Sequence, residues 1–278
     1  MNKNISLKAA ALSLLLLALF IGAWQLATQT VPKPIGQLTE YEQLMGKGAE
    51  KNNGIPTPVK MMAVLQQQLA HPFFDLGPNN KGIGLQLAYS LGRVVMGFLI
   101  AAVVAIPLGF LIGMSPLWYQ ALNPFIQILK PISPLAWMPI ALYTLRDAAT
   151  SAIFVIFICS VWPMLINTAF GVAGVRREWL NVARTLELGP FRTAFKVILP
   201  AAAPTILTGM RISMGIAWLV IVAAEMLVGG TGVGYFLWNQ WNNLFLPNVI
   251  MAIMGIGLVG MALDLSFAGL QKLLTYRE

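Results

Sequence analysis

Long apolar stretches without a single charge constrain this chain more than any other feature. After Arg93 no charged residue occurs before Lys130, and residues 9–27 form a second uncharged apolar stretch. A helix needs about 20 apolar residues to cross the hydrocarbon core of a bilayer. Of the 278 residues, 58% are hydrophobic and only 10% are charged, whereas soluble domains carry about 25% charged residues. Lipid is therefore the expected surrounding of much of the chain.

The pattern of apolar runs predicts an all-α integral membrane protein with six transmembrane helices. The expected spans are residues 9–27, 87–113, 119–144, 149–173, 202–228 and 248–271. The third contains Pro124, Pro131, Pro134 and Pro139, which predict a bent or broken helix, because membrane neighbours can satisfy the freed carbonyls.

Four regions of different character follow along the chain. They are a transmembrane helix over 1–28, an extracytoplasmic loop over 29–84 with one short helix near 59–69, a core of five helices over 85–272 that contains a cytoplasmic loop at 174–200, and a cytoplasmic tail over 273–278. The first apolar stretch has a second interpretation, as a cleaved signal peptide. Both interpretations place the proline-rich loop that follows it outside the cytoplasm.

A dense basic cluster between the fourth and fifth spans sets the orientation. Its members are Arg176, Arg177, Arg184, Arg192 and Lys196. Basic loops stay in the cytoplasm, so with six spans both chain ends are expected there too. The lysines of the first loop favour the opposite orientation, but that loop approaches the length of about 60 residues at which the rule weakens.

The segment over 178–198 predicts two short amphipathic helices joined by a break at Gly189 and Pro190, neither long enough to span. The apolar positions are Trp179, Val182, Ala183 and Leu186, then Phe191, Ala194, Phe195 and Ile198. Two interpretations are open from the spacing. The pair lies in the interface of the inner leaflet, or it inserts into a groove on a cytoplasmic partner.

Several classes of function do not fit the composition. Cys159 and His71 are the only cysteine and the only histidine, which argues against a disulfide within the chain, a zinc site and a histidine-based catalytic triad. No G-x-x-x-x-G-K-[ST] loop is present, so we expect no nucleotide, cofactor or metal on this chain. The net charge of +8 is spread between apolar runs, which favours lipid headgroups or an anionic cargo over nucleic acid.

Charges inside spans are costly and usually face protein or water. Lys130 and Arg211 are candidates to attract a monovalent anion, assisted by hydroxyls such as those of Ser133 and Thr208. The open alternative is that these cations pair with Glu225 or Asp264 inside the membrane, or extend to a headgroup. The candidate substrate pathway therefore comprises Lys130, Ser133, Arg211 and Glu225.

The segment at 178–200 resembles the cytoplasmic loop of ABC-importer permeases, whose pattern is E-A-A, three residues, Gly, and later a hydrophobic residue before Leu-Pro. Ala183, Leu199 and Pro200 match in place, while Asn181 and Val182 stand at the Glu and first Ala positions, and Glu187 at the Gly position. Further similar motifs fall in the family's order over 85–272. They are SLGRVVMGF, IPLGFLIG, KPISPLAWMPIAL, GMRISMGIAWLVIVAAEML and GGTGVGYFLW.

Within that family the chain is most similar to the nitrate/sulfonate/bicarbonate branch. The resemblance implies a type I importer permease in a bacterial inner membrane, working with a second permease copy as a homodimer, two cytoplasmic ATPases that hold ATP and Mg²⁺, and an extracytoplasmic binding protein. It implies nitrate or nitrite as cargo, with bicarbonate, cyanate or sulfonates as alternatives. The residues implied to couple to the ATPase are Asn181, Val182, Ala183, Arg184, Thr185, Leu186, Glu187, Leu188, Gly189 and Pro190.

A different class of function is an ion channel or an ion-coupled carrier that works without an ATPase. The chain lacks obvious inverted repeats and has few ionisable residues within its spans, which argues against a carrier. A channel does not need a cytoplasmic docking pair. Copurification of an ATPase through residues 178–200 separates these classes from an importer.

Overall fold

The structure is a computed structural model that describes residues 3–28, 55–77 and 81–274. Within these ranges the chain is almost entirely helical, and the only β-type pairing is an isolated bridge between Asp75 and Lys81. The predicted all-α class is confirmed. Residues 29–54 and 78–80 of the expected extracytoplasmic loop, and residues 275–278 of the expected tail, lie outside the described residues. The chain divides into two units, 1–72 with 239–251 and 73–238 with 252–278.

The first unit contains α1 (Lys3–Thr28) and α3 (Pro58–Ala70). Residues 7–28 of α1 are long and apolar enough to cross a membrane. The short helix predicted near 59–69 is confirmed as α3. Its start follows from Thr57, whose hydroxyl accepts the backbone N–H of Lys60, and from Pro58, which needs no N–H partner at the first helical position.

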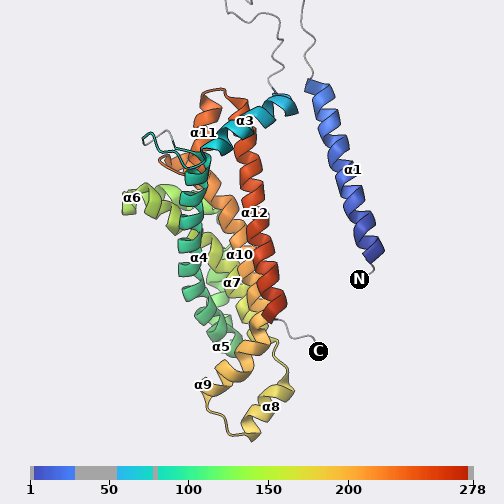
Figure 1. The fold of residues 1–278 in the computed structure, drawn as a ribbon. Coiled ribbons are helices and arrows are strands. Elements are labelled where there is room, and N and C mark those ends of the chain that lie inside the picture. The colour runs from blue at the N-terminus through green and yellow to red at the C-terminus, as the bar shows by residue number, and fades with distance from the viewer. Residues whose placement is uncertain (1–2, 29–54, 78–80, 275–278) are drawn as a thin grey trace, which may run out of the picture. The chain divides into compact units, whose positions relative to one another are not determined.

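The second unit is built on three long helices, α4 (Ile83–Met114), α7 (Ala148–Ala173) and α10 (Leu199–Val228). In Figure 1, α7 lies against both α4 and α10. Small residues allow this close approach: a Cβ at Gly109 of α4 would stand 2.6 Å from the Thr168 Cβ of α7. A Cβ at Gly209 of α10 would stand 2.6 Å from the Asn167 Cβ. Such small residues drive helix packing where lipid removes the hydrophobic contribution.

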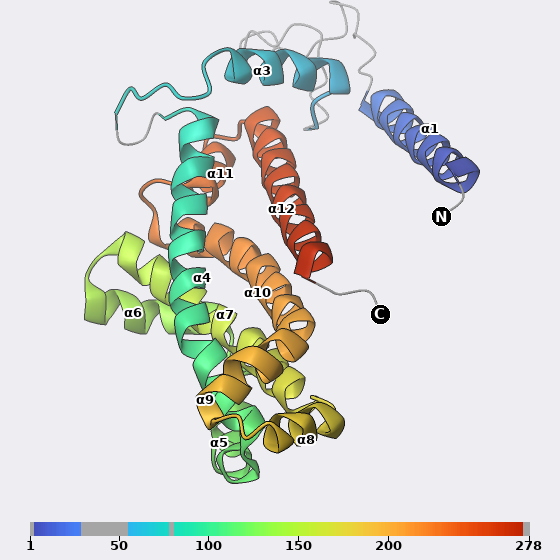
Figure 2. The same cartoon turned by 60° about the horizontal axis from the view of Figure 1, so that its bottom comes forward.

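α4 and α7 run in the same direction. Gly97 of α4 lies against Ile156 of α7, and twelve residues later Gly109 lies against Thr168. Two consecutive parallel helices require the segment between them to return across the core. That segment consists of α5 (Pro116–Leu129), η2 (Pro134–Trp137) and α6 (Met138–Leu145), with a bend of 86° at the break. It is therefore one broken span, and Figure 2 shows its two parts separately.

The predicted bent third span is thus confirmed, and its break is located. α5 continues through Pro124 and ends at Leu129, so the chain turns over residues 130–133. Pro131 has no N–H for a further helical hydrogen bond, and Ser133, directly before Pro134, has left the helical region with ψ of 129°. With α1, α4, α7, the helix through α10, and α12, the described residues supply six spans.

The prediction of two separate short helices over 178–198 was wrong for the second one. α8 (Arg177–Thr185) is separate, but α9 (Pro190–Thr193) continues through the π-helical segment η3 (Ala194–Ile198) into α10. Together residues 190–228 form one helical span of 39 residues. Pro200 has no N–H, and the wider turns before it, in which the Leu199 N–H bonds the Ala194 carbonyl, absorb this defect without ending the helix.

The last elements are α11 (Val233–Asn242) and α12 (Leu246–Leu274). A glycine-rich turn precedes α11, with Gly229, Gly230 and Gly232 at positive φ, a region that L side chains rarely adopt. The later part of α12 packs on the core: the Trp218 indole donates to the Ile256 carbonyl at 2.9 Å. At one end of the core lie α8, α9 and the end of α4 (Figure 1). The basic cluster lies at this end, for which the positive-inside rule predicts the cytoplasm.

Candidate functional site

The residues predicted to couple to an ATPase lie on α8, on the turn that follows it and at the first position of α9. Val182 and Leu186 are exposed, with 58% and 64% of their surface accessible, whereas Ala183 is buried at 2%. Farther along, Phe191 and Phe195 are 80% and 67% exposed. The predicted apolar stripe is therefore divided, because Ala183 faces the protein while its larger neighbours face outward. An exposed apolar surface among basic side chains is typical of an interaction site.

The turn after α8 has a defined geometry. The Glu187 N–H donates to the Arg184 carbonyl at 2.9 Å, and the Leu188 N–H donates to the Ala183 carbonyl at 3.0 Å. These two bonds form a Schellman motif, in which the residue after the cap is left-handed. Glu187 occupies that position with φ of 54°. A glycine would adopt this conformation without strain, and Glu187 stands where the family pattern has glycine.

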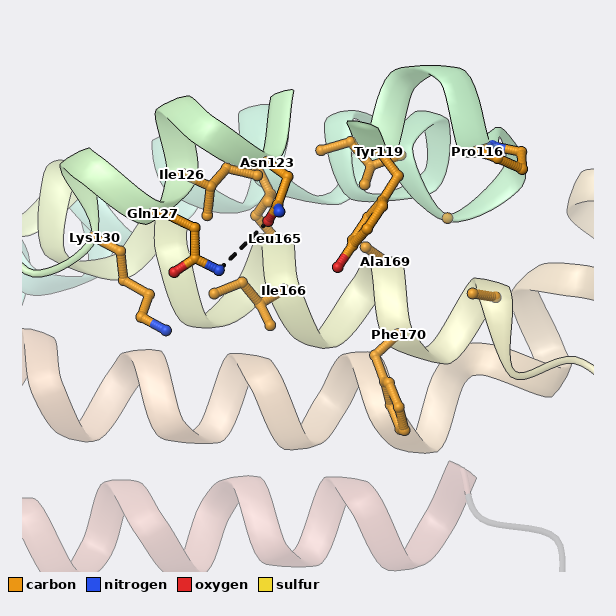
Figure 3. Close-up of a pocket in the computed structure, with 13 residues that line it drawn as sticks. Pro116, Tyr119, Asn123, Ile126, Gln127, Lys130, Leu165, Ile166, Ala169 and Phe170 are labelled. Atoms are coloured by element: carbon orange, nitrogen blue, oxygen red, sulfur yellow. Dashed lines mark hydrogen bonds between the residues drawn. The ribbon is translucent and has the colours of Figure 1, made fainter. Parts of the chain in front are cut away.

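A cavity of about 480 Å³ lies between α5 and α7 (Figure 3). Its polar side chains come from α5 and the break after it, and its apolar lining comes mainly from α7. The polar residues are Tyr119, Asn123, Gln127 and Lys130. A second cavity of about 390 Å³ continues from Lys130 toward Trp162, Asn167 and Ile216. Both cavities share Lys130 and Ile166.

Lys130 stands at the break of the third span. Its cavity neighbours Trp162 and Ile216 lie near the middle of α7 and α10, which places the ammonium group deep in the membrane rather than at its surface. No ion pair or hydrogen bond of the Lys130 side chain occurs within the described part of the chain, and neither cavity is lined by a carboxylate. Ser133 is exposed at the start of η2 and lines neither cavity.

Arg211 is neutralised by its neighbour on α12. Its Nε and Nη2 each donate to one oxygen of the Asp264 carboxylate at 2.6 Å, a bidentate pair. The pair borders a third cavity of about 660 Å³ that also contains Thr208. The Thr208 hydroxyl already donates to the Pro204 carbonyl at 2.9 Å. The sequence left open that these cations pair with a carboxylate inside the membrane. Arg211 does so, with Asp264, and Lys130 does not within the described residues.

Glu225 lies in a buried network and lines none of these three cavities. Its side chain is 1% exposed, and its carboxylate accepts Arg93 Nη1 at 2.7 Å, the Ser90 hydroxyl at 2.7 Å and the Gly234 N–H at 3.0 Å. The predicted pathway role for Glu225 therefore has no cavity to support it. Its contacts are those of a structural anchor between α10, α4 and the glycine-rich turn.

Sequence reasoning missed the α4 residues that complete this network. Gln86 accepts the Gly232 N–H at 2.6 Å, Ser90 accepts the Val233 N–H at 2.9 Å, and Arg93 donates to the Thr231 hydroxyl and carbonyl. A signal was present: positions 86, 90 and 93 follow the spacing i, i+4, i+7 and place three polar residues on one face of an apolar helix. A polar face inside a span predicts polar partners.

Comparisons with known proteins agree with this architecture. Residues 105–277 match the family described as "Binding-protein-dependent transport system inner membrane component". The nitrate import permease protein NrtB of Synechocystis sp. is 45% identical over 236 residues, which cover 85% of each chain. The bicarbonate transport system permease protein CmpB of Synechocystis sp. is 46% identical over 207 residues, which cover 74% of each chain.

Two solved structures share the fold at low sequence identity. The MetNI methionine ABC transporter, in an inward-facing conformation, aligns with a TM-score of 0.61 and 13% identity, covering 70% of this chain and 96% of that chain. An amino acid ABC transporter solved with histidines aligns with a TM-score of 0.55 and 15% identity, covering 77% and 95%. The family match and the relatives at 45% identity show that the chain belongs to the inner-membrane permease components of binding-protein-dependent ABC transporters, and the six spans agree with this.

Proposed function

We propose that this chain is the transmembrane permease of an ATP-driven importer whose cargo is nitrate. The observation that carries the cargo assignment is the 45% identity to a nitrate import permease over 85% of both chains. The cavities support an anion, because their lining supplies amide, phenol and ammonium donors and no carboxylate. Nitrite falls in the same chemical class of small monovalent oxyanions.

The energy comes from cytoplasmic ATPases that carry ATP and Mg²⁺ on their own residues. We assign their docking surface to the exposed side chains of Val182, Leu186, Phe191 and Phe195. Helix insertion into a groove is a recurring mode of recognition. Because α9 is continuous with α10, a movement of the docked segment is transmitted into a membrane span without an intervening flexible loop.

The complete importer on this proposal contains two copies of the permease, two ATPases and an extracytoplasmic binding protein. Closure of the ATPases around ATP draws the α8 segments together and opens the spans outward. The binding protein then releases its anion into the cavity between the spans. Hydrolysis reverses the movement and opens the path toward the cytoplasm, which is an alternating-access cycle.

Bicarbonate is the second candidate cargo, and a specific observation favours it. A bicarbonate permease is 46% identical to this chain over 207 residues. Nitrate and bicarbonate are both planar, monovalent oxyanions, so the donors around the cavities suit either one. Cyanate and sulfonates have no comparable observation in their favour.

The test is transport by the complete complex in proteoliposomes, assembled from the permease, its ATPases and its binding protein. We expect nitrate to stimulate ATP hydrolysis and labelled nitrate to accumulate only when ATP is present, with bicarbonate and chloride as comparison anions. Stimulation by bicarbonate but not nitrate would contradict the cargo. Nitrate flux that does not depend on ATP would instead indicate a channel or a carrier.

A further inference from the structure

We propose that the polar face of α5 lines the cytoplasmic half of the anion pathway and that Lys130 holds the oxyanion at the inner end of the bent span. The face consists of Tyr119, Asn123 and Gln127, with Lys130 directly beyond the helix end. This inference rests on the proposed function and goes further, because it names the residues along which the anion moves.

The spacing places these side chains on one face of α5. Relative to Tyr119, the other three stand at i+4, i+8 and i+11, which fall within about 80° of the helix circumference. The opposite face is apolar, with Phe125 and Ile128 exposed at 62% and 66%. A polar stripe on a membrane helix has to meet protein or water. Figure 3 shows the stripe directed at the cavity between α5 and α7.

The lining of the cavity shows where the stripe begins and ends relative to the membrane. At one end it is lined by Gly113, Pro116 and Ala173, which lie where α4 ends, α5 begins and α7 ends, at the cytoplasmic side. At the other end it reaches Lys130, where the second cavity begins. From Tyr119 to Lys130 the stripe rises by about 17 Å at 1.5 Å per residue. It therefore extends through roughly the inner half of the hydrocarbon core, which is about 30 Å thick.

Lys130 is the charged member of the stripe, and its positive charge favours an anion. Two carboxamides, a phenol and an ammonium group all donate hydrogen bonds, and no carboxylate lines either cavity. Arg211 differs, because Asp264 already compensates its charge. An ammonium group that lies within a span and has no carboxylate partner needs a counter-ion. A monovalent oxyanion that crosses from the second cavity to the first supplies that counter-ion transiently, at the point that the two cavities share.

Cysteine accessibility tests this pathway separately from transport. In a Cys159→Ala background, Tyr119→Cys, Asn123→Cys and Gln127→Cys are treated with anionic and cationic thiol reagents from the cytoplasmic side of the assembled complex. The matched controls, Phe125→Cys and Ile128→Cys, lie on the opposite face of the same helix. We expect labelling of the three stripe positions and not of the two controls. We also expect faster reaction with the anionic reagent, by about tenfold or more at position 127, because a nearby charge concentrates counter-ions.

Lys130 variants then test the anion site itself. We expect nitrate to slow labelling at position 127. Lys130→Gln should abolish both this protection and the preference for the anionic reagent. Lys130→Arg should retain both, because it keeps the positive charge. Lys272→Gln, which removes the same charge on α12 outside both cavities, should leave the labelling pattern unchanged.

The outcomes separate the pathway from the cargo. Protection by bicarbonate instead of nitrate would support the anion pathway and contradict only the cargo assignment. Unlabelled stripe positions in a complex that still imports nitrate would overturn the pathway and leave the proposed function intact. Protection that follows the anionic lipid content of the vesicles, and not nitrate, would identify the Lys130 counter-ion as a lipid phosphate and overturn the anion site.

Discussion

Glu225 of α10 and Arg93 of α4 form an ion pair of 2.7 Å in which the carboxylate is almost completely buried. The same carboxylate holds the Gly234 N–H at 3.0 Å. It also packs on Gly232, where an added Cβ would stand 2.1 Å from the Glu225 carboxyl carbon. The pair therefore joins two spans and fixes the glycine-rich turn, at the end of the core opposite α8.

Removing one partner of this pair should cost far more than removing both. Glu225→Ala leaves the charge of Arg93 and the donors of Ser90 and Gly234 without their acceptor, and breaking a buried pair in this way costs about 3–5 kcal/mol. Replacing both charged partners, as Glu225→Met with Arg93→Leu, should recover part of that loss. The measurement is the free energy of unfolding of the permease in bicelles. Equal losses in the single and double variants would contradict a coupled pair.

The sequence predicted the elements of the core better than it predicted which residues meet. Charge-free runs indicate spans because lipid excludes charge. The prolines between residues 124 and 139 indicate a bent helix. The partner of Glu225 was not predictable in the same way. Arg93 lies 132 positions away, and the two residues meet only because α4 and α10 are packed against each other.

The docking segment shows the same limit at shorter range. Helical spacing puts Ala183 and Leu186 on one apolar stripe, yet only Leu186 is exposed. The spacing defines which side chains share a face of the helix. Which of them are buried against the rest of the protein depends on packing, which the spacing does not give. The continuity of α9 with α10 was hidden for a different reason, because Pro200 is usually a helix terminator and the π-helical turns that accommodate it have no sequence signature.

Glu187→Gly should stabilise the turn after α8. A left-handed conformation costs an L-residue about 1–2 kcal/mol relative to glycine, and Glu187 has φ of 54°. Part of this gain is lost because glycine also loosens the unfolded chain. We therefore expect a net gain of about 1 kcal/mol or less, measured as slower hydrogen exchange of the Leu188 amide, whose bond to Ala183 closes the turn. Faster exchange would contradict the strain assigned to Glu187.

The ion pair between Asp75 and Lys81 should make the segment over residues 73–83 sensitive to acid. Lys81 Nζ lies 2.7 Å from the Asp75 carboxylate, and this hydrogen bond lowers the pKa of Asp75 below its ordinary value. A lowered pKa means that the pair stabilises the folded segment above the ordinary carboxyl pKa of about 4. That contribution is lost as the pH falls through the lowered pKa.

The pH dependence can be followed by hydrogen exchange of residues 73–83. We expect protection of the Gly82 amide, which bonds the Phe74 carbonyl at 2.8 Å, to decrease as the pH is lowered through this range after correction for intrinsic exchange rates. Asp75→Asn removes the titrating group and should show weaker protection with little change over the same interval. A similar decrease in both proteins would assign the pH dependence to another group.

A charge at Leu186 should have a different effect from the same charge at Ala183, because Leu186 is exposed and Ala183 is buried. Leu186→Asp places the charge on the exposed surface assigned to the ATPase, so the permease should fold normally and lose the ATPase on purification. Ala183→Asp buries a charge at a position that is 2% exposed, so it should lower the thermal stability of the permease itself. Arg177→Asp, an exposed change at the start of the same helix and outside the residues assigned to coupling, controls for the added charge. Retention of the ATPase by Leu186→Asp, with nitrate uptake at the normal rate, would show that the partner docks elsewhere.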